Sequence, residues 1–140
     1  MSATLISGLA RTTVPQTALR RFLALDAVVT AGNGLAYAAF SGPLGRLLGV
    51  GPSTLLALGL LLTVYGAGVG RLAASRRPPV LPVRLVIEAN YLWAVLSLVS
   101  LLVWFSPTTA GALWIPAQAL VVAAFALVQQ TALRATAAGR

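Results

Sequence analysis

The chain has 140 residues, of which 59% are hydrophobic and only 9% are charged. Soluble domains carry about 25% charged residues, so this composition excludes an ordinary soluble domain and indicates a one-domain integral membrane protein. The sequence contains no Cys and no His, which excludes disulfides, thiolate or imidazole metal ligands and a histidine base. We therefore expect no metal and no cofactor. The net charge of +8 comes from arginines between apolar stretches, so anionic membrane lipids, and not nucleic acid, are the expected partner.

Residues 1–19 are of mixed character and are expected to form a cytoplasmic or interfacial segment. No positive charge lies within the first ten residues, and no apolar run there precedes a small-residue cleavage site, so a signal peptide is not expected. Leu5, Ile6 and Leu9 can form a short interfacial turn.

The first predicted span runs from about residue 20 to residue 40. It carries a polar stripe at spacings of four, three and four, which places its members on one helix face. The members are Asp26, Thr30, Asn33 and Tyr37. Lipid cannot satisfy such a stripe, so it must face protein or water. Ser41, Gly42 and Pro43 should end the span, and the short segment after them should rest in the interface with Arg46 pointing outward.

The second predicted span runs from about residue 52 to residue 74, with Pro52 in the first turn. Gly59, Thr63, Gly66 and Gly70 share one face and predict close helix packing. The proline-rich stretch 75–82 is predicted to be a loop.

The third predicted span covers about residues 83–105 and carries Glu88, the second acidic residue of the chain. A second one-sided stripe runs along it. Its members are Asn90, Trp93, Ser97, Ser100 and Trp104. The fourth predicted span covers about residues 110–134, within a membrane domain of residues 20–135, and is followed by a short tail at residues 136–140. Its shared face contains Gln118, Val122, Phe125 and Gln129.

The arginines predict the topology. Nine of the ten lie before the first span, around the loop after the second or beyond the fourth, whereas Arg46 lies alone on the other side. The positive-inside rule then puts both termini in the cytoplasm. Similar polar positions recur about 63 residues apart, as for Arg21 and Arg84, so the bundle can also be interpreted as two hairpins related as parallel repeats.

Asp26 is the leading candidate catalytic residue. A carboxyl group buried in an apolar bundle favours its neutral form, in which it can donate a proton to an apolar substrate. Glu88 is a second, weaker candidate. The expected substrate-binding residues are Thr30, Asn33, Tyr37, Asn90, Tyr91, Trp93, Ser97 and Gln129.

Structural interpretations of the same residues stay open. Glu88 lies four residues after Arg84, so the two can form an interfacial ion pair, and it points nearly opposite to Asn90. Asp26 can pair with a neighbouring arginine, and Asn33 can join helices without touching a ligand. The tryptophans can be interface anchors.

The run from Leu25 to Gly49, together with NYLWAVLSLV from Asn90 to Val99, resembles the small four-span integral membrane proteins of actinobacteria. This resemblance implies fold and source and includes no catalytic motif. Small multidrug-resistance transporters are similar in having four spans and one acid in the first, but the Gly and Trp surroundings of that acid are missing here. Small membrane-bound terpene cyclases use a buried carboxyl, a role that Asp26 fits.

The sequence therefore predicts an all-α, polytopic up-down bundle of four spans in the bacterial cytoplasmic membrane. The leading functional hypothesis is a cavity that opens toward the cytoplasmic half and is lined by Asp26, Asn33, Asn90 and Trp93. It would bind an apolar, isoprenoid-like molecule, with acid-catalysed isomerisation or cyclisation as an extension. The alternatives are a proton-coupled transporter that uses Asp26 and a non-catalytic membrane subunit. A homo-oligomer is compatible with each.

Overall fold

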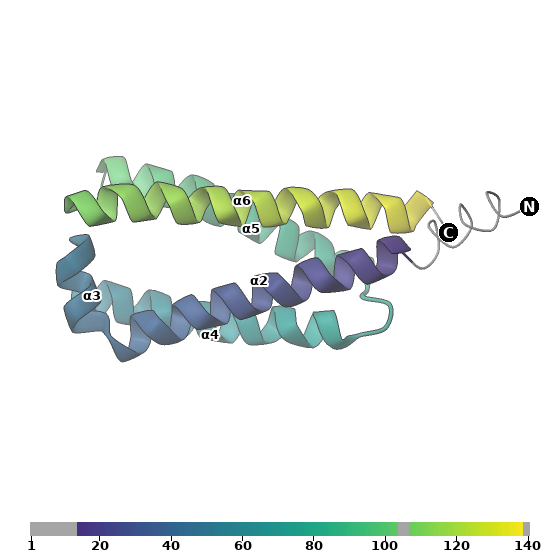
Figure 1. The fold of residues 1–140 in the computed structure, drawn as a ribbon, viewed down its shortest axis with the longest axis horizontal. Coiled ribbons are helices and arrows are strands. Elements are labelled where there is room, and N and C mark those ends of the chain that lie inside the picture. Colours follow the sequence, from purple (N-terminus) through teal and green to yellow (C-terminus); the bar gives the residue numbers. More distant parts are fainter. Residues whose placement is uncertain (1–13, 104–106, 139–140) are drawn as a thin grey trace, which may run out of the picture.

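The computed structural model describes residues 14–103 and 107–138, and the secondary structure within these residues is entirely helical (Figure 1). The helices are α2 (Val14–Ala39), α3 (Ser41–Leu48), α4 (Pro52–Ala74), α5 (Val80–Val103) and α6 (Thr109–Ala138). All except α3 are long and apolar enough to cross a membrane. The predicted all-α polytopic class is confirmed. The expected turn at Leu5, Ile6 and Leu9 and the position of Trp104 lie outside the described residues.

Several helix boundaries differ from those expected, and proline explains two of the differences. The motif at residues 41–43 ends α2 but also begins α3, and α5 begins at Val80, inside the expected loop. Pro43 and Pro82 each lie in the first turn of the new helix. The first backbone N–H groups of a helix have no partner within it, so a proline there removes no hydrogen bond.

The packing face predicted on the second span is confirmed by its contacts with α2. A Cβ atom added to Gly59 would lie 2.6 Å from the backbone nitrogen of Ala38, and one added to Gly66 would lie 2.7 Å from that of Ala31. A Cβ atom added to Gly34 of α2 would likewise lie 2.6 Å from the backbone nitrogen of Thr63. These contacts leave no room for a larger residue, so α2 and α4 form one tightly packed hairpin.

The second hairpin consists of α5 and α6, and the two hairpins meet unequally. Helix α2 packs along α6, whereas α4 and α5 hardly touch. Figure 1 shows the hairpins approaching each other near the chain termini and diverging toward α3. The side of the bundle where α2 meets α6 is therefore closed. On the opposite side, α4 and α5 make almost no contact; we call this side the α4–α5 seam.

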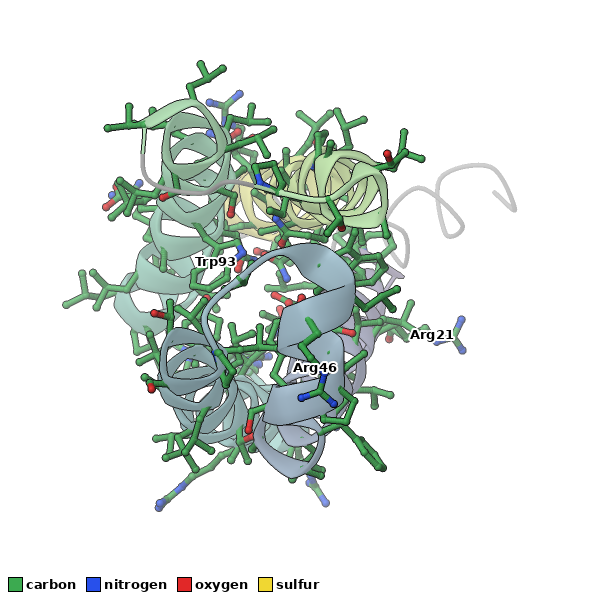
Figure 2. The ribbon with its side chains drawn as sticks, turned by 90° about the vertical axis from the view of Figure 1, so that its left-hand side faces the viewer. Arg21, Arg46 and Trp93 are labelled. Carbon is green, nitrogen blue, oxygen red and sulfur yellow. The ribbon has the colours of Figure 1, made fainter. Side chains whose placement is uncertain are left out.

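The two ends of the bundle also differ in charge. The start of α2, the end of α6 and the α4–α5 loop lie at one end, here called the arginine-rich end (Figure 1). Its described arginines are Arg20, Arg21, Arg71, Arg76, Arg77, Arg84 and Arg134. At the other end, here called the α3 end, Arg46 is exposed on the short helix, as expected from the sequence (Figure 2).

Helix α3 links the two hairpins at its own end. The backbone N–H of Thr108 donates to the carbonyl oxygen of Leu48 at 3.4 Å, and the Thr108 hydroxyl donates to the carbonyl of Leu47. Gly111 lies so close to the Leu48 carbonyl that a Cβ atom there would clash with it. Helix α3 is thus tied to the beginning of α6, and α5 is left free to diverge from α4.

The hydrophobic core is divided in the same way. The larger cluster of buried side chains fills the arginine-rich half of the bundle and includes Leu19, Leu23, Val69, Val83, Ile87, Ala126 and Leu133. The cluster near α3 is smaller and consists of Tyr37, Leu48, Val50, Leu55 and Ile115.

Candidate ligand-binding site

Asp26 lies at the centre of the bundle and is completely buried, with 0% of its surface exposed. Its Oδ1 atom accepts a hydrogen bond from the Thr30 hydroxyl at 2.9 Å. Its Oδ2 atom accepts from the side-chain amides of Asn90 and Gln129, each at 2.8 Å. The sequence placed Asn90 in the lining of the expected cavity, and this contact brings it directly onto the carboxyl group.

The hydrogen bonds around Asp26 continue to α4. The Asn90 amide also donates to Gln129 Oε1 at 3.1 Å. The Tyr65 hydroxyl lies 3.1 Å from Asn90 Oδ1 and 3.2 Å from the carbonyl oxygen of Val86, and its one proton can serve either acceptor. All four long helices therefore contribute to one buried polar network, consisting of Asp26, Thr30, Tyr65, Asn90 and Gln129.

Tyr65 is a member of the network that the sequence did not point to. Its signal is weak, because a single tyrosine among Leu, Val and Gly has no polar neighbour at helical spacing. The useful clue is chemical: a buried Tyr hydroxyl needs a hydrogen-bond partner.

The network lies at one level of the bundle. Asp26, Tyr65, Asn90 and Gln129 each lie five or six residues from an arginine of the same helix, namely Arg21, Arg71, Arg84 and Arg134. At 1.5 Å per residue, this separation is about 8–9 Å. The polar layer therefore lies inside the apolar part of the bundle, beyond the interface at the arginine-rich end.

The described part of the chain shows Asp26 bonded to Thr30, Asn90 and Gln129 rather than to an arginine. Arg20, an arginine near Asp26 on the same helix, donates instead from Nε to the carbonyl oxygen of Ala73, at 3.1 Å, near the end of α4. Such a contact satisfies a helix-terminal carbonyl that has no partner within its own helix. Among the described residues, the carboxyl group is thus held by neutral donors alone.

Two adjoining cavities extend from the network toward the α3 end, with volumes of about 350 Å³ and about 710 Å³. We call the first the inner cavity and the second the outer cavity. They share five lining residues and so adjoin each other between the hairpins; we refer to the two together as the pocket. The shared residues are Tyr37, Leu61, Trp93, Trp114 and Gln118.

The pocket lies on the other side of the network from the one expected. From the sequence, a cavity was expected to open toward the cytoplasmic, arginine-rich half, but that half is filled by the larger hydrophobic cluster. The lining of the outer cavity reaches Leu48 and Val50, beside α3. The hairpins diverge only beyond the polar layer, so this is where the space lies.

Side-chain hydrogen bonds stabilise the pocket walls. Trp93 Nε1 donates to Gln118 Oε1 at 2.9 Å, and Trp114 Nε1 donates to the Tyr37 hydroxyl at 2.6 Å. Figure 2, which looks along the bundle from the α3 end, shows Trp93 directed into the region between the hairpins. The indole rings thus present apolar faces to the pocket while their N–H groups are satisfied by the protein.

Most of the predicted binding residues lie in this pocket. Thr30, Asn33, Tyr37, Asn90 and Trp93 line the inner cavity, and Ser97 lines the outer one. Asp26 and Gln129 line neither cavity; both are completely buried, and they are hydrogen-bonded to Thr30 or Asn90, which line the inner cavity. Asp26 can therefore reach a molecule in the pocket only through these two partners.

Glu88 and Tyr91 lie elsewhere. They border a separate groove of about 330 Å³ near the arginine-rich end, where Glu88 is exposed and the Tyr91 hydroxyl donates to Gln130 Oε1 at 3.2 Å. Each residue turns a helix by about 100°, so Glu88 lies on nearly the opposite face from Asn90, and Tyr91 lies to one side of it. The tertiary structure does not bring them to the pocket.

In the inner cavity, Asn33 is the one polar residue whose side chain makes no hydrogen bond among the described residues. The other polar residues of that cavity are all engaged, namely Thr30, Tyr37, Tyr65, Asn90, Trp93, Trp114 and Gln118. Its amide is half-buried and offers both donors and an acceptor. Within residues 14–103 and 107–138, no group of three or more His, Cys, Asp or Glu side chains is placed to hold a metal ion.

Comparison with known proteins gives no family: no family model matches the chain, and neither the curated proteins nor the solved structures provide a match.

Proposed function

We propose that this chain is a multi-pass protein of the bacterial cytoplasmic membrane that binds an apolar, isoprenoid-like small molecule in the pocket between its hairpins. The observation that carries the proposal is the pocket itself: its volume is in the range of small-molecule sites, and its lining combines aromatic walls with a few polar groups. A bundle whose polar stripes served only to join helices would have no reason to leave this space.

Access from the bilayer supports a lipid-like ligand. Leu61 of α4 and Trp93 of α5 both line the pocket, yet the two helices hardly touch. A molecule already dissolved in the membrane can enter through this seam without crossing water. The flexible chain of an isoprenoid would contact the apolar side chains of the outer cavity, which include Leu48, Val50, Leu55, Leu58, Leu96 and Ile115.

Photocrosslinking tests the binding proposal. The purified protein in lipid nanodiscs would be irradiated with a diazirine-bearing isoprenoid alcohol, and labelled peptides would be identified by mass spectrometry. Labelling is expected at pocket residues and should be lost in Ala117→Phe, which adds an aromatic ring at the wall of the inner cavity. Ala124→Phe is the matched control, since Ala124 is exposed on the same helix and lines neither cavity. Equal labelling of both variants contradicts the proposal.

Acid catalysis by Asp26, as in an isomerase or terpene cyclase, is an extension of this proposal that needs a proton route. Asn90 and Gln129 can only donate to the carboxyl through their N–H groups, whereas the Thr30 hydroxyl can also accept a proton from Oδ1 and lines the inner cavity. Thr30 is therefore the route by which a proton on Asp26 would reach a ligand.

Product analysis with isoprenoid alcohols tests the catalytic extension. Turnover is expected to disappear in Asp26→Asn and Thr30→Val and to return in Thr30→Ser, which keeps a hydroxyl. Product formation by Asp26→Asn rules the extension out, while the binding proposal still depends on the labelling experiment.

The same hydrogen-bond chain from Asp26 to the cavity favours proton-coupled transport as a second candidate. It predicts a pH-dependent flux in proteoliposomes that vanishes in Asp26→Asn. A third interpretation, a non-catalytic subunit, is supported by the complete pairing of Asp26 and predicts that no probe binds.

The proposed orientation places the arginine-rich end in the cytoplasm, as the positive-inside rule requires. The chain has no Cys, so Arg46→Cys and Arg76→Cys each introduce a unique thiol. A membrane-impermeant maleimide added to whole cells should label the first variant and not the second; the reverse pattern would invert the topology.

A further inference from the structure

The polar groups that line the pocket are all uncharged. They are the side chains of Thr30, Asn33, Tyr37, Thr54, Tyr65, Asn90, Trp93, Ser97, Ser100, Trp114 and Gln118. Asp26 is hidden from both cavities and already accepts three hydrogen bonds, and the exposed Arg46 does not line them. A charged group taken from water into this space would lose its hydration without meeting a counter-ion. The pocket therefore discriminates against ionised ligands.

Within the inner cavity, next to the network, Asn33 offers the free hydrogen-bonding capacity among the described residues, whereas the hydroxyls of Thr54 and Ser100 lie in the outer cavity. Trp93 donates to Gln118, and Trp114 donates to Tyr37, so these groups already have protein partners. The Asn33 amide lines the inner cavity and has none among the described residues. An amide pairs equally well with a hydroxyl or a carbonyl group, since it both donates and accepts.

We infer that the ligand is an amphipathic lipid with a small uncharged oxygen head, an alcohol or a ketone, which hydrogen-bonds to Asn33 in the inner cavity. Its hydrocarbon chain passes between Trp93 and Trp114 into the outer cavity, toward the α3 end. This inference rests on the proposed function and specifies the ligand class and the residue that selects it.

A set of competitors with identical hydrocarbon chains tests the head group. An alcohol, a methyl ketone, a carboxylate, a primary ammonium and the parent hydrocarbon would each compete with the photoreactive isoprenoid alcohol in nanodiscs. The alcohol and the ketone are expected to compete about tenfold more strongly than either charged compound and about fivefold more strongly than the hydrocarbon, as one satisfied hydrogen bond implies.

Asn33→Leu should remove the advantage of the alcohol over the hydrocarbon, so that the two compete equally, while labelling of the pocket persists. Asn33→Ala serves as a second variant should the leucine disturb folding. Thr131→Val is the control: it too removes a polar side-chain group from a long helix, but Thr131 is exposed, lines neither cavity and donates to the carbonyl of Leu127. Thr131→Val should leave the advantage of the alcohol over the hydrocarbon unchanged.

The outcomes separate the inference from the proposal on which it rests. Equal or stronger competition by the ammonium or the carboxylate overturns the uncharged head. An unchanged alcohol-to-hydrocarbon ratio in both Asn33 variants overturns the role of Asn33. If no compound competes and Ala117→Phe has no effect on labelling, the binding function itself fails.

Discussion

The arginine-rich half and the α3 half of this bundle are built from the same four long helices, but only the first is filled. Below the polar network, side chains such as Leu23 and Val83 close the centre completely. Above it, α2 remains packed on α4 while α4 and α5 part, and the pocket occupies the space between the hairpins. The comparison indicates how a small membrane protein can combine a stable core with a cavity: the loop joining α4 to α5 holds one end together, and α3 ties the other end to α6.

The network marks the boundary between the halves. Its hydrogen bonds connect all four long helices at the level where the hairpins begin to diverge. Buried polar groups in lipid need partners, so these bonds fix the relative rotation of the helices and thereby decide which faces line the pocket.

The largest loss of stability is expected from disrupting the tightly packed hairpin of α2 and α4, which runs through both halves. In Gly66→Leu the new side chain meets the backbone of Ala31, which cannot move aside, so the free energy of unfolding should fall by about 3 kcal/mol. Gly68→Leu is the control on the same helix, because a Cβ atom there meets nothing within 4 Å. Unfolding in mixed micelles followed by circular dichroism measures both. Similar stability of the two variants would contradict the packing described for α2 and α4.

A slightly smaller loss of stability should follow from removing the carboxyl group at the centre of the polar network. Asp26→Leu leaves the amides of Asn90 and Gln129 without their shared acceptor and should lower the free energy of unfolding by about 2–3 kcal/mol.

Asp26→Asn should cost less than about 1 kcal/mol, because its oxygen can still accept from both amides while its N–H group donates to Thr30. The same micelle unfolding assay compares the two variants. Comparable losses for leucine and asparagine would show that the network requires the carboxylate charge.

The two halves can be compared directly by equivalent truncations. Leu23→Ala opens a cavity in the filled half and should lower the free energy of unfolding by about 2 kcal/mol, near the lower end of the range for core leucines, since the unfolded reference state also lies in lipid. Leu55→Ala merely enlarges an existing cavity and should cost about 1 kcal/mol. Thermal unfolding in nanodiscs compares the stability losses of the two variants. A larger loss for Leu55→Ala would contradict the conclusion that the arginine-rich half is the filled one.

The smallest effect concerns the pocket wall. Trp93→Phe removes the hydrogen bond to Gln118 but keeps an aromatic face, so stability should change by only about 0.5–1 kcal/mol. Photolabelling at residues of the inner cavity should persist, with altered distribution. Trp114→Phe is the parallel variant for the bond to Tyr37, and a total loss of labelling in either would mean that the indole N–H contacts the ligand.

The sequence was informative wherever a feature is local to one helix. Span length and apolarity predict the four long helices, the three-and-four spacing identifies the face containing Asp26, Thr30, Asn33 and Tyr37, and the glycine face of α4 predicts its close partner. The grouping of the arginines at one end follows from the spans, because each span reverses the chain.

What remained undecided depends on how the helices meet. The same periodicity is compatible with Asp26 facing an open cavity or a sealed network. Nothing in the sequence of α4 marks Tyr65 as the residue through which this helix joins the network. The position of the pocket on the α3 side likewise depends on the attachment of α3 to α6 through Thr108 and Gly111, a contact between segments more than fifty residues apart. Helical spacing determines which residues share a face; only the packing of one hairpin against the other determines whether that face meets protein, lipid or empty space.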